Sequence, residues 1–554
     1  MKTVINQDSP TAVNGPDQPT KEELEPAITP QSPKPSYGLV PIVLLAVSLS
    51  AGSFYYFFSR GMTNCYGDGV AHVNIARKVV DSLDDSLWQR YMQIGSPWLP
   101  LQTVLMLPLV ESEALWRTGA AGSLVSMLSF VVCAAALYLL ARFFYRDSDV
   151  PLRRFFPLLS VAILLFNPSA LYMQSTPMTE LVLMASLVLA VYSLLRWVAE
   201  QTRTRLVIAG SVMAIATLSR YEAWPVAFIA AVIVFVSTRG ATKAKAINLL
   251  VFSGVASLGP IYWLWHNWAI YGDPLEFLTG PNSARGIYLQ NRANLGWTRI
   301  FVGHAALDFV TMLATAAVSV GPFLLLLALI GFTHWLVTSL RRRTLIAQSP
   351  VLLLLVPFVF HVVSLYRGEI QIFPLGAFGL HNVRYGLPQL TAVALFAPNW
   401  CAVFRESRRG LALTGFLLIL IGQYAWLVSD GPSQLAVYQE GFRNGVNARP
   451  ARERATMSNY LREHAPQPLI LMQTGALGPL VSQGGLRFAN IIHEGTARWH
   501  QINDRIPADV NAVVLQEGDP LDQRFKANER LESDLRQNFE EEMSAGKIKL
   551  YRRR

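Results

Sequence analysis

The stretch SLVSMLSFVVCAAALYLLARFFYRDSDVPLRR, residues 123–154, decides the fold class. Its first part, residues 123–140, is an uncharged and largely apolar run of about the length that crosses a lipid bilayer as an α-helix. Its second part contains Arg142, Arg146, Arg153 and Arg154. Basic residues directly after an apolar run are typical of the cytoplasmic end of a membrane-spanning helix. The stretch therefore predicts a helical membrane protein.

Composition extends this prediction to most of the chain. Of the 554 residues, 52% are apolar and 15% are charged, whereas about 25% are charged in a soluble domain. Mean hydropathy is +0.31. We predict an α-helical polytopic membrane protein with about eleven transmembrane helices. The predicted spans are residues 39–58, 123–140, 155–166, 181–195, 206–218, 224–236, 249–265, 320–340, 351–365, 385–397 and 411–428.

Basic clusters follow every even-numbered span, which sets the orientation. By the positive-inside rule these loops are cytoplasmic. The N-terminus is then also cytoplasmic, and the region after the last span lies outside an inner or plasma membrane. After the cluster quoted above, the later clusters are Arg196, Arg203 and Arg205; Arg239, Lys243 and Lys245; Arg341, Arg342 and Arg343; and Arg405, Arg408 and Arg409.

Three regions differ in composition. Residues 1–37 are rich in Pro, Ser, Thr, Gln and Glu, which predicts a disordered tail. Residues 38–430 form the membrane region, with a large first outer loop at residues 59–117. Residues 431–554 are polar, and we predict a small extracytoplasmic α/β domain. Its expected elements are a helix at 451–464, strands at 469–472, 512–515 and 547–551, and an amphipathic helix at 521–543. Residues 301–317 predict an interfacial or re-entrant helix.

The charge and the cysteines exclude several functions. A net charge of +10 could indicate a protein that binds nucleic acid. In a membrane protein, basic residues at the cytoplasmic loop ends explain the same charge, so no nucleic-acid partner is expected. Cys65, Cys133 and Cys401 lie far apart and match no metal or disulfide spacing. We assign no metal ligands and no cofactor, and leave a divalent cation open.

Unusual polar residues gather in the outer loops. Asp68 lies just past the first span, between Gly67 and Gly69, and His72 follows closely. Trp98 belongs to the element GSPWLPL, residues 95–101. A turn with a helix cap would explain the first group. An interfacial aromatic belt would explain Trp98 and the nearby Trp88 and Tyr91 equally well.

Further polar residues stand at the outer ends of later spans. Glu180 opens the fourth span, Arg220 and Glu222 lie in a very short loop, and Arg384 with Tyr385 opens the tenth. Each alone is explained by a structural ion pair or by an arginine that reaches the lipid headgroups. Their common location at one face predicts a shared cavity.

These motifs resemble the GT-C class of glycosyltransferases, especially protein O-mannosyltransferases and aminoarabinose-lipid A transferases. The resemblance covers roughly residues 37–428 and rests on the aspartate and the Pro-bearing GSPWLPL element of the first outer loop, and on the late Arg-Tyr pair. It departs from the family where Asp68 has no acidic neighbour and where Trp98 and Leu99 separate the two prolines. The resemblance implies a catalytic base at Asp68 and a second acidic site at Glu180. Arg384 and Tyr385 are then expected near the donor phosphate.

The activity implied by the resemblance is inverting transfer of a sugar from a polyprenyl-phosphate-linked donor. The acceptor would be a hydroxyl or amine of a glycan, lipid or protein. Membrane lipids are a further expected partner of the protein. The residue types suit this chemistry. An aspartate accepts the proton of the attacking group, and the planar fork of Arg384, or of Arg220 as second choice, binds a phosphate through paired hydrogen bonds. His72 is a candidate for binding acceptor, phosphate or metal, and Trp98 for stacking on a sugar.

Three alternatives compete with this interpretation. A transporter or lipid flippase predicts charged or broken helices near the bilayer midplane and inverted repeats, and no repeat is evident. A non-enzymatic membrane scaffold predicts that Asp68, Glu180 and Arg384 share no cavity. A ligase of the O-antigen type would use a diphosphate donor instead.

Overall fold

The computed structural model describes residues 38–84, 86–146, 150–292, 296–374, 379–464 and 469–554. The predicted tail at residues 1–37 lies outside them. Six helical segments in this part of the chain are long and apolar enough to cross a membrane, and all six coincide with predicted spans. They are α1 (Leu39–Phe58), α6 (Ala120–Phe144), α9 (Glu180–Glu200), α17 (Pro322–Arg341), the segment Leu345–Tyr366 that ends in α19 (Val356–Tyr366), and Glu406–Leu427 with α21 (Arg409–Leu427).

The other five predicted spans are helical but shorter or bent. The seventh span is a pair of helices, α12 (Thr242–Ala256) and α13 (Leu258–Tyr271), bent by 44°. The remaining four contain α7 (Phe156–Leu165), α10 (Arg203–Thr217), α11 (Ala223–Ser237) and α20 (Gln389–Phe396). These helices have eight to fifteen residues, and a helix of that length does not reach across about 30 Å of hydrocarbon by itself. The count of eleven spans therefore stays a prediction.

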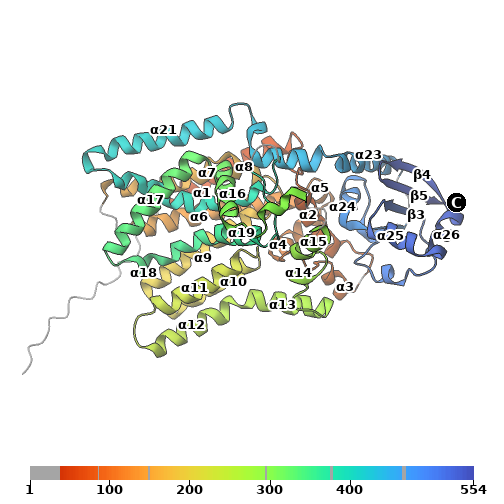
Figure 1. The fold of residues 1–554 in the computed structure, drawn as a ribbon, viewed down its shortest axis with the longest axis horizontal. Coiled ribbons are helices and arrows are strands. Elements are labelled where there is room, and N and C mark those ends of the chain that lie inside the picture. The colour runs from red at the N-terminus through yellow and green to blue at the C-terminus, as the bar shows by residue number, and fades with distance from the viewer. Residues whose placement is uncertain (1–37, 85, 147–149, 293–295, 375–378, 465–468) are drawn as a thin grey trace, which may run out of the picture. The chain divides into compact units, whose positions relative to one another are not determined.

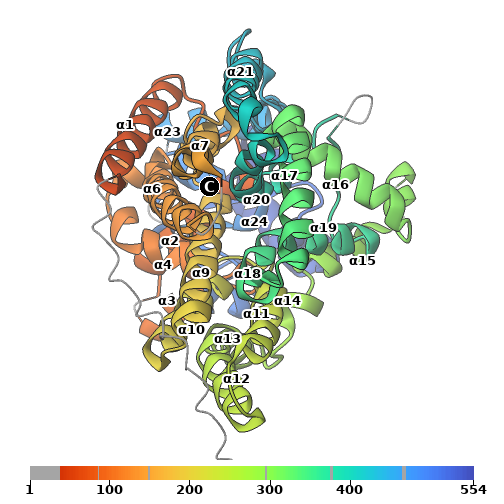
Figure 2. The same ribbon diagram turned by 90° about the vertical axis from the view of Figure 1, so that its left-hand side faces the viewer.

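Helix α9 lies deep inside the bundle, and small residues of α6 contact the segment that leads into it. Most of its apolar window is buried, whereas α1 buries only 17% of its own. Figure 2 shows α1 at the edge of the bundle. On α6, Ser123 Oγ donates to the Ser175 carbonyl at 2.9 Å and Ser126 Oγ to that of Met178 at 2.8 Å. Such small-residue contacts are typical of packing between helices in a bilayer.

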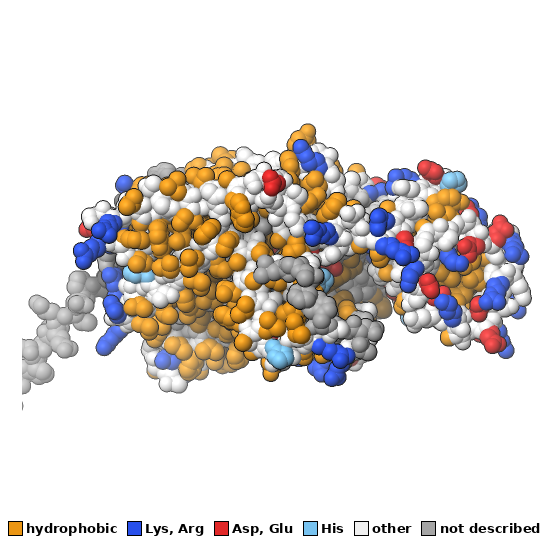
Figure 3. Space-filling model, turned by 45° about the horizontal axis from the view of Figure 1, so that its top comes forward, with side chains coloured by type: hydrophobic (Ala, Val, Ile, Leu, Met, Phe, Trp, Pro, Cys, Tyr) orange, Lys and Arg blue, Asp and Glu red, His pale blue; other side chains and the backbone are white. Residues whose placement is uncertain are grey.

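The surface of the helical region is that of an integral membrane protein. Figure 3 shows a continuous hydrophobic surface over its middle, with Lys and Arg side chains gathered at the end away from the C-terminal domain. Large apolar side chains such as Val40, Leu44 and Phe228 stand exposed on it. A soluble monomer rarely leaves so much contiguous apolar surface in water. The lipid bilayer is the solvent that such a surface requires.

The first outer loop is largely helical. It contains α2 (Gly67–Val80), α3 (Leu87–Met92), α4 (Leu101–Val110) and α5 (Glu113–Arg117). In Figure 1, α2, α4 and α5 lie between the bundle and the C-terminal sheet. Residues 301–317, predicted as an interfacial or re-entrant helix, correspond to α16 (Ala305–Val320). Further short elements of the membrane region are η1 (Pro151–Phe155), α8 (Pro168–Met173), α14 (Glu276–Thr279), α15 (Ala284–Asn291), η3 (Gly296–Phe301), α18 (Leu345–Gln348), η4 (Ser349–Leu355), η6 (Val383–Gly386), η7 (Ala397–Val403) and η8 (Glu406–Arg408).

The C-terminal region carries a five-stranded sheet of order β2-β1-β3-β5-β4. Strands β1 to β3 pair in parallel, and β5 pairs antiparallel with both β3 and β4. The strands are β1 (Ile470–Met472), β2 (Ile491–Ile492), β3 (Ala512–Gln516), β4 (Phe539–Ala545) and β5 (Ile548–Arg553). The helices are η9 (Pro432–Gln434), α22 (Ala436–Glu440), η10 (Gly441–Val446), α23 (Arg449–Glu463), α24 (Thr474–Gln483), η11 (Phe488–Asn490), η12 (Ala497–Gln501), α25 (Pro520–Ala527) and α26 (Glu529–Asn538).

One sequence prediction in this domain is wrong. Residues 521–543 were expected to form a single amphipathic helix, but α25 and α26 divide the segment and residues from Phe539 onward form β4. The apolar spacing continues into the strand by coincidence. Cross-strand ion pairs favour the hairpin instead, because Glu541 and Glu542 face Lys549 and Arg552 of β5. Gly546, with φ of +61°, forms the turn.

His493 is buried in the C-terminal domain, where it is only 1% exposed. Its Nδ1 accepts a hydrogen bond from the Gly495 N–H at 3.1 Å. Burial, reinforced by the charge of Lys78, lowers the pKa of His493 from 6.5 to about 3. The histidine is therefore buried as a neutral ring.

This burial predicts acid sensitivity. The unfolded chain takes up a proton near pH 6.5, whereas the folded domain takes it up only near pH 3. Stability is therefore lost as pH falls through this window. His493→Asn keeps an acceptor for the Gly495 N–H but does not titrate. We expect its melting temperature to fall less than that of the wild type between about pH 7.5 and about pH 5. His500→Asn, at an exposed histidine, is the matched control, and an equal fall in all three proteins would contradict the prediction.

Candidate active site

Asp68 lies in the first turn of α2, which packs directly against the segment before α9. A Cβ on Gly69 would come within 2.8 Å of Pro177 Cγ, and one on Gly122 of α6 within 2.4 Å of Pro177 Cβ. The two glycines thus enclose Pro177 and bring α2, α6 and the start of α9 together. The Asp68 side chain remains 47% exposed. Gly69 therefore serves helix packing, whereas the sequence also allowed a turn with a helix cap.

Arg384 is the centre of the site. It lies in η6, is 6% exposed, and its guanidinium contacts three carboxylates. Nη2 donates to Asp68 Oδ2 at 2.6 Å and Nη1 to Glu440 Oε1 at 3.3 Å, while Nε lies 3.2 Å from Glu180 Oε1. These partners come from the first outer loop, the start of α9 and the segment after the last span. A single buried cation therefore joins segments that are more than 300 residues apart in sequence.

Glu440 holds the backbone around Arg384. It ends α22 and is 3% exposed. Its two oxygens accept the backbone N–H groups of Asn382 and Val383 at 2.8 and 2.9 Å. Asn382 itself adopts a left-handed conformation, with φ of +53°, at the start of η6. Burial raises the pKa of Glu440, and the Arg384 guanidinium opposes that shift.

A second guanidinium extends the cluster toward α11. Arg220 Nη1 donates to Thr179 Oγ1 at 2.7 Å and lies 3.4 Å from Glu180 Oε1. Its Nε donates to Glu222 Oε1 at 2.9 Å. On the far side, His361 Nε2 donates to the same Glu222 oxygen at 3.1 Å. Glu180, which is fully buried, therefore lies between two arginines.

Tyr385 lies against both cations. Its ring centroid is 5.2 Å from the Arg384 guanidinium and 5.3 Å from that of Arg220. The His361 ring stacks on it at 5.0 Å with planes 11° apart. Cation–π contact and stacking hold the two arginines in one orientation. Tyr66 supplies a second ring beside Arg384, at 5.2 Å, and its hydroxyl donates to the Val437 carbonyl.

His72 and Trp98 lie on the Asp68 side of the cluster. His72 follows Asp68 by one helical turn and contacts the Trp98 ring at 4.4 Å. Burial lowers the pKa of His72 to about 4, against the opposing charge of Asp68. The imidazole is therefore neutral at physiological pH. The GSPWLPL element is held in place because Tyr221 donates to the Pro97 carbonyl at 3.3 Å and His266 Nε2 contacts that of Gly95 at 2.9 Å.

The structure thus brings all eight predicted site residues into one region. Six of them form the ionic cluster: Asp68, Glu180, Arg220, Glu222, Arg384 and Tyr385. Three residues that sequence reasoning missed complete it: Glu440, His361 and Tyr66. Glu440 carried a signal, since it is the charged residue of an otherwise uncharged segment, residues 431–442, just after the last span. Trp88 and Tyr91 lie elsewhere, stacked on each other in α3.

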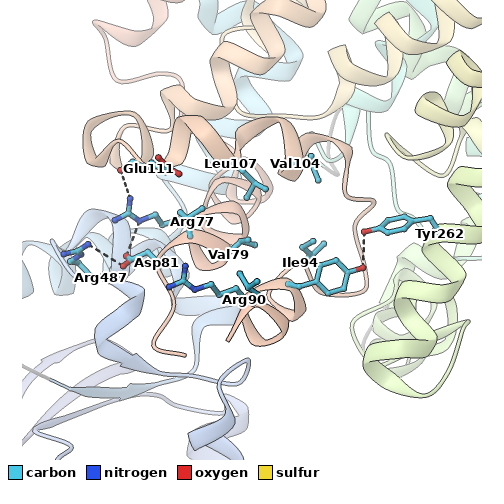
Figure 4. Close-up of a pocket in the computed structure, with 13 residues that line it drawn as sticks. Arg77, Val79, Asp81, Arg90, Ile94, Val104, Leu107, Glu111, Tyr262 and Arg487 are labelled. Carbon is cyan, nitrogen blue, oxygen red and sulfur yellow. Dashed lines mark hydrogen bonds and ion pairs between the residues drawn. The ribbon is translucent and has the colours of Figure 1, made fainter. Parts of the chain in front are cut away.

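A separate pocket of 570 Å³ lies beside the C-terminal half of α2, and none of the eight residues lines it. Figure 4 shows Arg77, Asp81 and Arg487 at one end of this pocket and Tyr262 at the other. Among the described residues, no group of three His, Cys, Asp or Glu side chains is placed to hold a metal ion.

The comparisons with known proteins concern both sequence and fold. Residues 115–265 match the family profile described as dolichyl-phosphate-mannose-protein mannosyltransferase. The comparison with curated proteins found no match. Apo ArnT from Cupriavidus metallidurans is 14% identical, with a TM-score of 0.51 over 92% of this chain and 98% of that one. The chain has the fold of the GT-C glycosyltransferases.

Two further solved structures resemble this chain at 12% identity and a TM-score of 0.49. One is ArnT from Cupriavidus metallidurans bound to undecaprenyl phosphate, over 92% of this chain and 97% of that one. The other is the apo oligosaccharyltransferase of Archaeoglobus fulgidus, over 87% and 70%.

The role of Glu440 yields a stability prediction. Glu440→Ala leaves two buried N–H groups without their acceptor and removes one carboxylate from Arg384, which costs roughly 3 kcal/mol. We expect a melting temperature several degrees below that of the wild type. Glu440→Gln keeps an acceptor oxygen and is expected to lose less. An unchanged melting temperature in Glu440→Ala, measured on purified protein in detergent, would contradict this account of η6.

Proposed function

We propose that this chain is a membrane glycosyltransferase. It transfers a sugar from a polyprenyl-phosphate-linked donor to a hydroxyl or amine of a glycan, lipid or protein acceptor, with inversion at the anomeric carbon. The observation that carries the proposal is the contact between Asp68 and Arg384. It places a half-exposed carboxylate, which can take a proton, against a guanidinium that can hold a phosphate.

The mannosyltransferase profile over residues 115–265 supports the choice of donor. It covers Glu180, Arg220 and Glu222, which form the half of the ionic cluster contributed by α9 and the loop before α11. The profile's own description names a dolichyl-phosphate-linked sugar, which is a polyprenyl-phosphate donor of the proposed type.

The proposed step is a single displacement. The acceptor oxygen or nitrogen attacks the anomeric carbon while its proton passes to the Asp68 carboxylate. The bond between the anomeric carbon and the phosphate oxygen breaks, and its electron pair leaves on the phosphate. The products are the glycosylated acceptor and the polyprenyl phosphate. Because Asp68 is half exposed, it can return the proton to water afterwards.

Arg384 stabilises the leaving phosphate. A guanidinium has five N–H donors, and its three nitrogens each face one carboxylate in this structure. The second N–H on each of Nη1 and Nη2 is left to meet phosphate oxygens. Fixed donors of this kind stabilise developing charge without reorganising during the reaction. Arg220, joined to Arg384 through Glu180 and Tyr385, supports it as the second cation.

His72 and Trp98 are proposed to contact the sugar or the acceptor. Trp98 is half-buried and presents an aromatic face next to the Asp68 turn, and its neutral neighbour His72 can donate or accept a hydrogen bond. An aromatic face beside a hydrogen-bonding side chain suits a carbohydrate, which has apolar C–H faces and hydroxyl edges.

The location of the charges favours a transferase over a transporter. Glu180 opens α9, Glu222 precedes α11, and Arg384 lies just before α20, so the cluster lies at helix ends. A transporter site is expected near the middle of the spans. Together with the basic clusters at the other helix ends, this arrangement supports an extracytoplasmic site and C-terminal domain and a cytoplasmic N-terminus.

Asp68→Asn tests the base directly. The amide keeps the shape of the side chain but accepts no proton, so we expect transfer to fall by at least about 100-fold. The assay offers purified protein a panel of polyprenyl-phosphate sugars and measures donor consumption. Asp273→Asn, at a partly exposed aspartate after α13 that lies outside the ionic cluster, is the control that should retain the wild-type rate. Full activity in Asp68→Asn would reject Asp68 as the base.

Arg384→Lys tests the phosphate site. Lysine keeps the positive charge among the carboxylates but lacks the planar fork, so we expect polyprenyl phosphate to bind about tenfold more weakly. Binding is read as the ligand-dependent rise in melting temperature of purified protein. Lys245→Arg, in the cytoplasmic cluster after α11, is the control. Equal stabilisation of Arg384→Lys and wild type would remove Arg384 from the donor site.

A further inference from the structure

Helix α2 runs from the ionic cluster, at its first turn, to the C-terminal domain, at its last turn. Asp68 lies in its first turn, and Asp81 follows directly after its last residue, Val80. In the part of the chain that the structure describes, the Asp68 carboxylate has its hydrogen bond and ion pair with Arg384. Because the Asp68 side chain is half exposed, the position of its carboxylate depends on how firmly α2 is held. The contacts at the other end of the helix show what holds it.

Arg77 and Asp81 form a buried ion pair at that end. Arg77 Nε donates to Asp81 Oδ2 at 3.1 Å, and both side chains are about 5% exposed. The remaining N–H groups of Arg77 donate to the carbonyls of Val110 and Glu111 at 2.7 and 3.1 Å and to Glu113 Oε1 at 2.7 Å. Arg77 therefore ties α2 to the end of α4 and the start of α5 in the first outer loop.

Asp81 carries this network into the C-terminal domain. The same oxygen, Oδ2, accepts the backbone N–H of Phe488 at 3.2 Å. Arg487 Nη2 lies 3.6 Å from Oδ1. Figure 4 shows Arg77, Asp81 and Arg487 converging from two elements. One carboxylate thus receives donors from α2 itself and from the C-terminal domain.

Neighbouring side chains repeat the same connection. Lys78 Nζ donates to Thr474 Oγ1 at 2.6 Å, and Gln93 Nε2 donates to the Gly495 carbonyl at 2.7 Å. Asp84 Oδ2 accepts the N–H of Ala497 at 3.1 Å. On the other side of the loop, Arg117 donates to the carbonyls of Ser482 and Leu486. All of these contacts join residues 77–117 to residues 474–497.

Because α2 is a rigid helix, contacts that hold its C-terminal end also fix the position of Asp68 at its N-terminal end. The two carboxylates lie thirteen residues apart, about 20 Å along a rigid helix. A tilt of about 5° around Asp81 would move Asp68 by roughly 2 Å. A displacement of about 1 Å can cost roughly 100-fold in rate when a catalytic group must meet its substrate.

We propose that the C-terminal domain positions Asp68 by holding α2, with Arg77 and Asp81 as positioning residues. The inference rests on the proposed transferase function. Neither residue contacts the ionic cluster around Arg384, so both act through the helix. The holding contacts come from residues 474–497 of the domain, which contribute no side chain to the ionic cluster.

Asp81→Ala and Asp81→Asn test the proposal in the full-length protein. Alanine removes both acceptor oxygens, and asparagine keeps one for the Phe488 N–H. We expect kcat to fall by roughly 10- to 100-fold in the alanine variant and less in the asparagine variant, with the donor KM unchanged. Asp509→Ala removes the Arg498–Asp509 ion pair of the same domain, away from α2, and should retain the wild-type kcat. All assays are run well below the melting temperature of each variant.

Hydrogen–deuterium exchange provides a readout that needs no activity. Asp81→Ala should speed exchange in residues 67–80 and leave α9 unchanged, whereas Asp509→Ala should leave both unchanged. A wild-type kcat in Asp81→Ala, a rise in donor KM that accounts for the loss, or faster exchange across the whole bundle would overturn the proposal. If the wild type transfers no sugar, the proposed function fails, and unchanged exchange in residues 67–80 would separately reject the positioning role.

Discussion

The structure of the site depends on one buried guanidinium. Arg384 is almost excluded from water, and a cation in that position is tolerated only when carboxylates and hydrogen bonds surround it. Asp68, Glu180 and Glu440 meet this requirement from three distant parts of the chain. The need to neutralise one charge therefore brings together the first outer loop, the start of α9 and the segment after the last span. Each of the three carboxylates faces a different nitrogen of the guanidinium, so the site assembles as a unit.

The need to surround buried cations with partners also explains how the Arg384 part and the Arg220 part of the site are linked. Glu180 contacts both arginines, and Tyr385 lies against both of them. In the proposed reaction, a donor phosphate would meet cations whose orientation is already fixed, which lowers the reorganisation needed to stabilise a leaving group. Asp68 is the half-exposed member of the cluster and is the group proposed to reach the acceptor. The further proposal is that the C-terminal domain fixes the angle of α2.

Sequence patterns predicted much of the architecture because lipid and water impose simple rules. Six predicted spans coincide with long apolar helices, and the predicted strands near residues 470, 513 and 549 exist. The failures have physical causes. Residues 539–543 continue a helical apolar spacing, but pairing with β5 across the Gly546 turn outweighs the local preference. Glu440 was missed because its partner, Arg384, is 56 residues away in sequence.

The sequence by itself determined that the chain is a helical membrane protein and that Asp68, Glu180, Arg220 and Arg384 stand at helix ends. The length of an apolar run and the charge beside it are local properties of the sequence, and they are enough to decide whether a segment spans the bilayer and in which orientation. Only the tertiary structure decided which of these charges touch. Ion pairing in a low-dielectric interior depends on distances of about 3 Å between residues hundreds of positions apart. Tertiary packing, such as that of α2 and α6 around Pro177, brings these segments together.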